Sequence, residues 1–281
     1  MNNSKLLFYD FVKAITLPES REEIQGIAYL VFENLLGLSK AQILAEKTIT
    51  VSPSHEAKLR DAVQRINQHE PVQYVLGEAD FFGRKFQVSP AVLIPRPETE
   101  ELVRLIIDRT TTDEPKILDI GTGSGCIPIT LALEIAGSIV YATDVSTAAL
   151  AVAKDNAIKL NARVTFMEHD ILKEELTLRA LDVVVSNPPY IAPEEQRDMK
   201  SNVVDHEPHL ALFTPVDDPL IFYRTIVNKA KAALRSGGLL CMEINERYGE
   251  AVLELLTAAG YKDVQIIKDL SGKDRIVKGL L

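Results

Sequence analysis

The sequence has little cysteine, no long hydrophobic run and no excess of positive charge. Its two cysteines, Cys126 and Cys241, lie far apart and in no metal-ligand spacing, so we interpret them as small buried side chains in a reducing compartment. No metal site is expected. No apolar stretch approaches the ~20 residues that a membrane-spanning helix needs.

The start of the chain, residues 1–10, lacks the basic-then-apolar pattern of a secretory signal. We therefore expect a soluble, cytoplasmic protein. The formal net charge is −9, and an acidic protein repels phosphate backbones on average, so direct binding of nucleic acid is not expected. The length of 281 residues suffices for one large α/β domain plus a small extra unit.

Residues 1–70 carry apolar side chains at helical spacing and are predicted to form a small helical domain. Gly37 followed by Ser39 predicts the end of one helix and the N-cap of the next, and Ser54 is expected to precede another helix. This region has no glycine-rich loop and no dense cluster of titratable groups. Catalysis is therefore expected elsewhere in the chain.

Residues 71–95 are predicted to form a β-hairpin linker with a tight turn at Gly83-Arg84-Lys85.

The remainder, residues 96–281, alternates helix and strand. Helical crossovers make its earlier strands parallel, whereas the short connection 271–273 requires an antiparallel pair. The sequence therefore predicts an α/β fold: a mostly parallel sheet with an antiparallel C-terminal hairpin. The predicted strands are 116–120, 139–144, 164–170, 181–186, 239–244, 263–270 and 274–281; the predicted helices are 98–110, 126–136, 147–160, 219–235 and 247–260.

A glycine-rich loop, Asp119-Ile120-Gly121-Thr122-Gly123-Ser124-Gly125, directly follows one predicted strand and opens a helix. Glycines there allow a sharp turn and close approach of the backbone to a ligand. Asp144 ends the next strand, where a carboxylate can accept both ribose hydroxyls of a nucleoside cofactor. The loop alone is equally compatible with an ordinary strand–helix turn. Cys126 replaces the third glycine of the dinucleotide fingerprint, which disfavours NAD.

The sharpest signal is Asn187-Pro188-Pro189-Tyr190, which follows the predicted strand 181–186. Ligands of open α/β sheets bind at the carboxyl ends of strands. The Asn187 side-chain oxygen and the Pro188 carbonyl can together accept both hydrogens of a planar –NH₂ group, and Tyr190 offers an aromatic face. A proline-rich turn that only breaks a helix is the bland alternative, and the position relative to the glycine-rich loop disfavours it.

In combination these motifs resemble the class I S-adenosylmethionine-dependent methyltransferases and, within them, the release-factor glutamine methyltransferases (the PrmC/HemK family). The resemblance spans most of the chain and implies a Rossmann-like sheet. The segment VLIPRPETE separates this family from base methyltransferases that share N-P-P-Y. The matching segments are Glu70–Tyr74, Phe81–Gly83, Val92–Glu100 (VLIPRPETE), Asp119–Gly125, Asp144 and Asn187–Ile191.

The resemblance implies methyl transfer from S-adenosylmethionine, with S-adenosylhomocysteine as product, to the side-chain amide nitrogen of the glutamine in the Gly-Gly-Gln motif of peptide chain release factors. It assigns the methionine end of the cofactor to the glycine-rich loop, the ribose to Asp144 and the adenine to Asp170 and Ile171. The implied cofactor-binding residues are Gly121, Thr122, Gly123, Ser124, Gly125, Asp144, Asp170, Ile171 and Asn187. The implied substrate-binding residues are Asn187, Pro188, Pro189 and Tyr190, of which Asn187 and Pro188 are the catalytic acceptors.

We expect a monomer. The helical domain, residues 1–70, is separate and carries no evident chemistry, which predicts that it recognises the protein substrate, and the resemblance strengthens this prediction. The sequence departs from the family's usual pattern at two single residues and one short segment. Ile171 stands where an aromatic residue is frequent, His206 stands where tyrosine is usual, and Phe213-Thr214-Pro215 replaces a glycine pair. The last two lie in a segment expected to face the substrate, so the preferred release factor is left open.

Several side chains have two interpretations. Arg96 and Glu98 are expected to form an internal ion pair rather than to line the site. Glu243 ends a predicted strand, where facing the pocket and lying solvated are equally compatible with the sequence. His206 and His209 resemble a metal pair, but Pro208 between them disfavours a shared helical face, and no third ligand is evident.

Two other functions compete with this interpretation. A nucleic-acid base methyltransferase would use the same N-P-P-Y motif to hold the exocyclic amino group of a flipped base. The acidic charge and the VLIPRPETE segment argue against it. A non-catalytic scaffold that binds the cofactor is disfavoured by the presence of both intact motifs.

Overall fold

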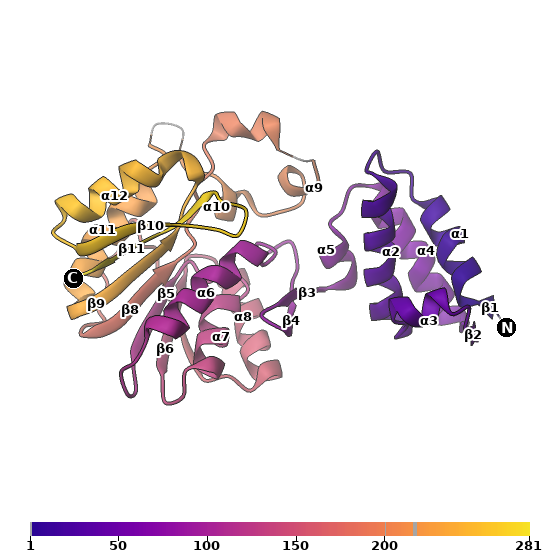
Figure 1. The fold of residues 1–281 in the computed structure, drawn as a ribbon, viewed down its shortest axis with the longest axis horizontal. Coiled ribbons are helices and arrows are strands. Elements are labelled where there is room, and N and C mark those ends of the chain that lie inside the picture. Colours follow the sequence, from indigo (N-terminus) through magenta and orange to yellow (C-terminus); the bar gives the residue numbers. More distant parts are fainter. Residues whose placement is uncertain (1, 200, 216–217) are drawn as a thin grey trace. The chain divides into compact units, whose positions relative to one another are not determined.

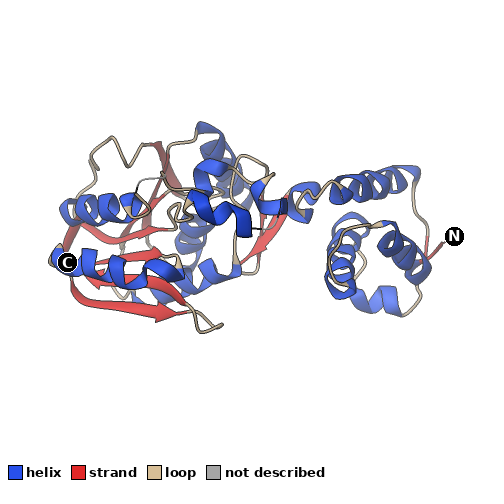
Figure 2. Cartoon of the chain, turned by 90° about the horizontal axis from the view of Figure 1, so that it is seen from above, coloured by secondary structure: helices blue, strands red, loops and turns tan. Residues whose placement is uncertain are grey.

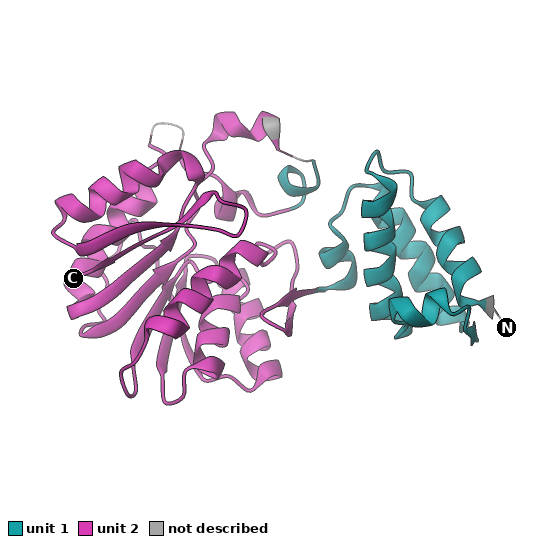
Figure 3. Cartoon of the chain, in the orientation of Figure 1, with its two compact units in different colours: residues 1–78, 200–206 teal, residues 79–199, 207–281 magenta. Residues whose placement is uncertain are grey.

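Two compact units make up the chain in the computed structural model, which describes residues 2–199, 201–215 and 218–281. The first unit comprises residues 1–78 with 200–206, and the second comprises residues 79–199 with 207–281 (Figure 3). The first unit has one cluster of buried apolar side chains, and the second has two. Among the described residues, no helix is both long and apolar enough to cross a membrane.

The first unit consists almost wholly of helix (Figure 2). Its centre holds Phe8, Phe11 and Phe32, whose rings meet edge to face. Such burial of aromatic rings is a large part of the apolar area that stabilises a small helical unit. Its described elements are β1 (Asn2–Asn3), α1 (Ser4–Ala14), α2 (Arg21–Leu36), α3 (Lys40–Leu44), β2 (Thr48–Ile49), α4 (Pro53–Asn67), α5 (Val72–Leu76) and α9 (Ser201–Val204).

Capping residues set the helix ends of the first unit. Gly37 ends α2 in the left-handed conformation, and Ser39 caps α3 through a capping box, as the sequence predicted. The prediction for α4 was wrong by two residues. Its N-cap is Ser52, whose hydroxyl accepts from the His55 N–H, and Pro53 occupies the first helical position, where a missing N–H costs nothing.

A seven-stranded sheet forms the centre of the second unit, in the order β10-β11-β9-β8-β5-β6-β7. The pairs among β9, β8, β5, β6 and β7 are parallel, and β10 and β11 add an antiparallel edge. The predicted α/β fold with its antiparallel C-terminal hairpin and helical N-terminal domain is confirmed. The strands are β5 (Lys116–Ile120), β6 (Ile139–Asp144), β7 (Val164–Glu168), β8 (Leu181–Ser186), β9 (Leu234–Glu243), β10 (Lys262–Lys268) and β11 (Asp274–Leu280).

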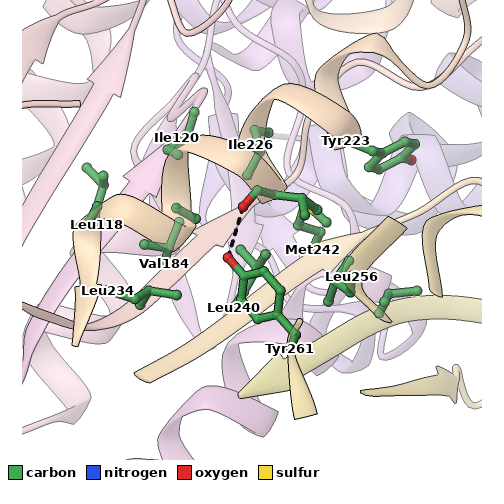
Figure 4. Close-up of a cluster of buried hydrophobic side chains, with 14 of the residues drawn as sticks. Leu118, Ile120, Val184, Tyr223, Ile226, Leu234, Leu240, Met242, Leu256 and Tyr261 are labelled. Carbon is green, nitrogen blue, oxygen red and sulfur yellow. Dashed lines mark hydrogen bonds between the residues drawn. The ribbon is translucent and has the colours of Figure 1, made fainter. Parts of the chain in front are cut away.

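Helices cover both faces of this sheet (Figure 1). Successive strand residues point to opposite faces, so Val184 joins one apolar cluster while Val183 and Val185 join the other. The first cluster includes side chains of α11 and α12, and within it the Tyr261 hydroxyl donates to the Val227 carbonyl at 3.0 Å. Figure 4 shows side chains of this cluster, with a dashed line from Tyr261 for this hydrogen bond. The second includes side chains of α6 and α7. These helices are α6 (Pro97–Arg109), α7 (Cys126–Glu134), α8 (Thr147–Leu160), α11 (Ile221–Ala233) and α12 (Gly249–Ala258).

The predicted hairpin is present as β3 (Glu78–Phe81) and β4 (Arg84–Gln87), but its turn lies one residue earlier than predicted. Phe82 and Gly83 occupy the turn with φ of 51° and 71°. Two successive positive φ values are characteristic of tight hairpin turns, which glycine adopts freely and phenylalanine does not. The Phe82 N–H donates to Glu100 Oε1 at 2.8 Å, and this tertiary bond helps hold the turn. Shorter elements complete the unit: η1 (Pro193–Asp198), α10 (His209–Leu212) and η2 (Glu246–Tyr248).

Candidate functional site

The glycine-rich loop joins β5 to α7 at the carboxyl end of the parallel strands. The Gly121 N–H donates to the Thr143 carbonyl at 2.9 Å, which fastens the loop to β6. Gly125 precedes α7 with φ of 80°, and a Cβ there would lie 2.9 Å from Ile129 Cδ1 and 3.1 Å from Ala153 Cβ. Gly125 therefore allows α7 and α8 to pack closely, and it does not line the cavity beside the loop.

Asp144 ends β6 and holds the glycine-rich loop in shape. Its Oδ2 accepts from the Gly123 N–H at 2.8 Å, and its Oδ1 accepts from the Ser146 N–H at 2.9 Å. Burial raises the pKa of this carboxyl, while the backbone N–H groups act against the rise. Each carboxylate oxygen still has a lone pair free for a hydroxyl donor, because an ionised carboxylate can accept about four hydrogen bonds.

Asp119, the last residue but one of β5, is a buried acid just before the glycine-rich loop, and no role was predicted for it from the sequence. It is fully buried, and neither carboxylate oxygen has a hydrogen-bond partner among the residues that the structure describes. Burial raises the pKa of this carboxyl from 3.8 to about 7, although the neighbouring Thr122 hydroxyl opposes the rise. Buried, unsatisfied acceptors are costly and are concentrated at functional sites. The signal in the sequence was an acid directly before a glycine-rich loop.

A cavity of about 420 Å³ lies at the carboxyl ends of β5, β6 and β8, entirely within the second unit. This volume is in the range of small-molecule binding sites. Most of the predicted site residues meet here, although they come from segments far apart in the sequence. The predicted residues that line it are Gly121, Thr122, Gly123, Ser124, Asp144, Asp170, Ile171, Asn187, Pro188 and Pro189; Gly125 and Tyr190 are not among its lining residues.

The segment after β7 forms another wall of the cavity. Asp170 is held by an ion pair with Lys173 at 2.8 Å, which lowers the pKa of its carboxyl, and its Oδ1 accepts from the Leu172 N–H. Ile171 is buried. His169 also lines the cavity, and its Nε2 is buried without a hydrogen-bond partner among the described residues. His169 could not be predicted from the sequence, because a single histidine at a strand end carries no pattern.

The N-P-P-Y segment leaves the end of β8 and turns its first three residues to the cavity. The Ser186 hydroxyl donates to the Ile120 carbonyl at 2.7 Å and joins this strand end to the glycine-rich loop. The Asn187 Nδ2 donates to Thr99 Oγ1 at 3.3 Å. The Tyr190 hydroxyl instead donates to Glu243 Oε1 at 3.2 Å, behind the cavity wall.

Glu243 and Arg96 have partners that the sequence did not reveal. Glu243 is only 1% exposed, which contradicts the solvated alternative. It accepts from the Thr99 hydroxyl at 2.7 Å as well as from Tyr190. Arg96 pairs with Glu207 at 2.5 Å rather than with Glu98, and the second oxygen of Glu207 accepts from the Ile94 N–H at 3.2 Å. The expected pair with Glu98 was wrong: Arg96 braces a different carboxylate, and it also lines the cavity, which the sequence had disfavoured.

The histidines considered as a metal pair belong to different units, with His206 in the first and His209 in the second. The His206 Nε2 lies 3.3 Å from the Gln68 carbonyl, and the His209 ring meets Phe213 edge to face. Over the described residues, no group of three or more His, Cys, Asp or Glu side chains is arranged to hold a metal ion.

Comparisons with known proteins agree with this architecture. Residues 99–209 match the family described as methyltransferase small domain, and residues 14–77 match the PrmC N-terminal domain. A solved methyltransferase from Pyrococcus furiosus superposes with a TM-score of 0.52 over 82% of this chain and 98% of its own, at 17% identity. The second unit is thus a class I methyltransferase fold, with its cavity at the strand ends.

Similarity to curated relatives gives the particular family. The chain is 43% identical to a release factor glutamine methyltransferase of Bacteroides thetaiotaomicron, over 91% of this chain and 92% of that protein. It is 39% identical to one of Flavobacterium psychrophilum, over 95% of each. The chain belongs to the release factor glutamine methyltransferase family, and it is a methyltransferase.

Proposed function

We propose that this enzyme transfers a methyl group from S-adenosylmethionine to the side-chain amide nitrogen of the glutamine in the Gly-Gly-Gln motif of peptide chain release factors. The observation that carries the proposal is that Asn187 and Pro188 line the same cavity as Gly121 and Asp144. An amide-binding pair and a nucleoside-binding pair thus meet in one small space. The names of the relatives support the release factor as the substrate.

The residues present fit S-adenosylmethionine. The cofactor's methionine end carries an ammonium group, and the unsatisfied carboxyl of Asp119, which directly precedes the glycine-rich loop without lining the cavity itself, is a complementary charge. Asp144 retains lone pairs for ribose hydroxyls, and Ile171 and Asp170 would flank the adenine. When bound, this cofactor supplies a methyl group activated by its sulfonium. The lone pairs, charges and apolar walls of the cavity therefore correspond to its parts.

The substrate amide is held by acceptors alone. Asn187 Oδ1 and the Pro188 carbonyl accept the two hydrogens of the planar –NH₂ group, and the prolines contribute no competing N–H donor. Because both bonds draw on the amide hydrogens, they increase electron density on a nitrogen whose lone pair is otherwise delocalised. Fixing the nitrogen in line with the methyl group supplies the proximity contribution, which is large for well-oriented reactants.

The helical first unit recognises the release factor in this proposal. It has its own apolar core, and only one buried polar residue, Ser4, is recorded in it among the described residues. A unit with no buried charged side chain among its described residues suits a docking role. This assignment also accords with the match of residues 14–77 to the PrmC N-terminal domain.

The test is direct. The purified protein is incubated with labelled S-adenosylmethionine and a release factor, and the label is located by peptide mass spectrometry. We expect it on the glutamine of the Gly-Gly-Gln motif, at a rate that falls by about a hundredfold with Asn187→Ala. Parallel tubes with RNA and DNA serve as the competing substrates. Label on a nucleobase, with none on the release factor, would move the substrate to a base amino group and reject the proposal.

A further inference from the structure

A buried carboxylate outside the cavity wall connects both ends of the N-P-P-Y segment. Glu243 is the last residue of β9, and it accepts from the Thr99 hydroxyl through Oε2 and from the Tyr190 hydroxyl through Oε1. Thr99 in turn accepts from the Asn187 amide. One side chain therefore holds Tyr190 directly and Asn187 through a single intermediate. The three elements involved, α6, β9 and the segment after β8, meet only through tertiary folding.

The chemistry of these groups gives the chain of hydrogen bonds a direction. An ionised carboxylate only accepts, so the single proton of the Thr99 hydroxyl is directed to Glu243. Thr99 Oγ1 then has only lone pairs left for its other neighbour. The atom of Asn187 that lies 3.3 Å away must therefore be the –NH₂ nitrogen, since the amide oxygen would bring two acceptors together.

This direction fixes which end of the Asn187 amide is free. With Nδ2 bound to Thr99, Oδ1 is the atom left to accept a hydrogen bond from a ligand. A side-chain amide rotated by 180° would offer a donor instead, and a donor cannot hold the –NH₂ group of a substrate. We propose that Thr99 and Glu243 are positioning residues that orient Asn187, so that its oxygen serves as the substrate acceptor. This inference rests on the proposed function, in which the substrate is an amide.

The burial of Glu243 is consistent with a role in positioning Asn187. Taking a carboxylate out of water is costly unless hydrogen bonds and charges compensate, and burial raises the pKa of Glu243. The bonds from Thr99 and Tyr190 and the nearby Arg275 charge oppose that rise without cancelling it. These compensating donors are the groups that the carboxylate holds in place. An apolar side chain at this position would fill space but could not direct the Thr99 proton.

The test compares Thr99→Val with Thr99→Ser. Valine keeps the shape and removes the hydroxyl, whereas serine keeps the hydroxyl. Thr130→Val is the matched control, because Thr130 is buried on α7 and its hydroxyl has no hydrogen-bond partner among the described residues. For each protein we would measure kcat and KM with a release factor, the Kd for S-adenosylmethionine and Tm.

We expect Thr99→Val to lower kcat by about tenfold or more, the usual scale for leaving one amide unanchored. Its Kd for the cofactor and its Tm should stay close to those of Thr130→Val, and Thr99→Ser should recover most of the rate. Wild-type kcat in Thr99→Val, or a serine variant as slow as the valine one, would overturn the inference. Equal losses of kcat and of cofactor affinity would also overturn it. A wild-type protein that does not methylate the release factor would reject the proposed function itself.

Discussion

The two units of this enzyme differ in what they bury. In the first unit, aromatic and aliphatic side chains fill the core, and Ser4 is the one buried polar residue recorded among its described positions. The second unit buries four carboxylates and one lysine as well as a larger apolar core: Asp119, Glu207, Glu243, Asp269 and Lys278. Burying a charge is costly unless partners compensate. The free-energy cost of burying charge is thus concentrated in the unit that contains the cavity.

The difference in buried charge between the two units coincides with the position of the cavity. All four buried carboxylates lie near the carboxyl ends of the strands or in segments beside them. Glu207 and Glu243 have their donors within the protein, whereas Asp119 has none among the described residues. We expect substitutions in the first unit to act through folding, whereas substitutions around these carboxylates act on binding and turnover as well as on stability.

The largest effect is expected from Phe32→Ala in the first unit. Phe32 is fully buried and contacts both Phe8 and Phe11, with ring centroids 5.4 and 5.5 Å away. Truncating such a ring costs about 3–5 kcal/mol of unfolding free energy. Methylation of the release factor should fall with the folding of this unit, while the second unit, which has its own cores, keeps its affinity for S-adenosylmethionine. Urea unfolding and calorimetry measure the two quantities.

Leu6→Ala is the control for this change, because Leu6 is 65% exposed. Its effect on unfolding should stay within about 0.5 kcal/mol, as for most surface substitutions. Loss of cofactor affinity in Phe32→Ala equal to its loss of methylation would show that the units do not behave separately.

The next effect concerns pH and Asp119. The folded pKa of about 7 lies above the ordinary value of 3.8, so between these values the folded state holds a proton that the unfolded state has lost. Unfolding free energy therefore falls as pH rises through this window, by up to about 4 kcal/mol for a shift of about three units. Asp119→Asn should flatten that fall, as seen in urea unfolding between pH 4 and 8.

Cofactor binding provides an independent check on Asp119. A cationic ammonium favours the ionised carboxylate, so binding to the wild-type protein should release a proton and strengthen as pH rises through 7. Asp119→Asn should bind S-adenosylmethionine more weakly and without this pH dependence. An unchanged pH dependence in the variant would remove Asp119 from the cofactor site.

A smaller effect is expected from Asn187→Ala, and it falls on turnover. Removing one preorganised hydrogen-bonding group at a reacting centre typically lowers kcat by about a hundredfold. The glycine-rich loop and Asp144 are untouched, so the Kd for S-adenosylmethionine should change by less than about threefold, well under 1 kcal/mol. A rate assay with a release factor and calorimetry with the cofactor separate the two. Parallel losses would contradict the division of the cavity into an amide-binding and a cofactor-binding part.

Local patterns explain why much of the fold was predictable. The helix at 147–160 was predicted with the bounds that α8 has, because Ser146 caps it and Asn161 ends it in the left-handed conformation. The strands could be predicted because buried parallel strands are short apolar runs between turn residues. The cavity residues that motifs identify, such as Gly121 and Asn187, lie at strand ends, where topology alone brings them together.

What could not be predicted depends on distant contacts. Thr99 and Glu243 are separated by 144 positions, and nothing in either local sequence indicates their hydrogen bond. The turn at Phe82 likewise depends on Glu100, since phenylalanine is unfavourable at a positive φ. Arg96 was expected to pair with its near neighbour Glu98, but Glu207 competes successfully from another segment. Sequence spacing alone predicts ion pairs between near neighbours. In the folded protein a buried carboxylate needs a cation to compensate its lost hydration, so Arg96 pairs with buried Glu207.

The last prediction uses that same ion pair. Glu207 is buried and is held by Arg96 and the Ile94 N–H, so Arg96→Ala leaves a buried carboxylate with one donor fewer. Because Arg96 is partly exposed and water can enter, we expect a loss of about 2 kcal/mol of unfolding free energy, less than for a fully buried pair. Lys5→Ala breaks an exposed pair with Glu46 in the first unit and should leave Tm unchanged. If the two variants change Tm by the same amount, the buried carboxylate of the second unit does not depend on its ion pair more than the exposed carboxylate of the first unit does.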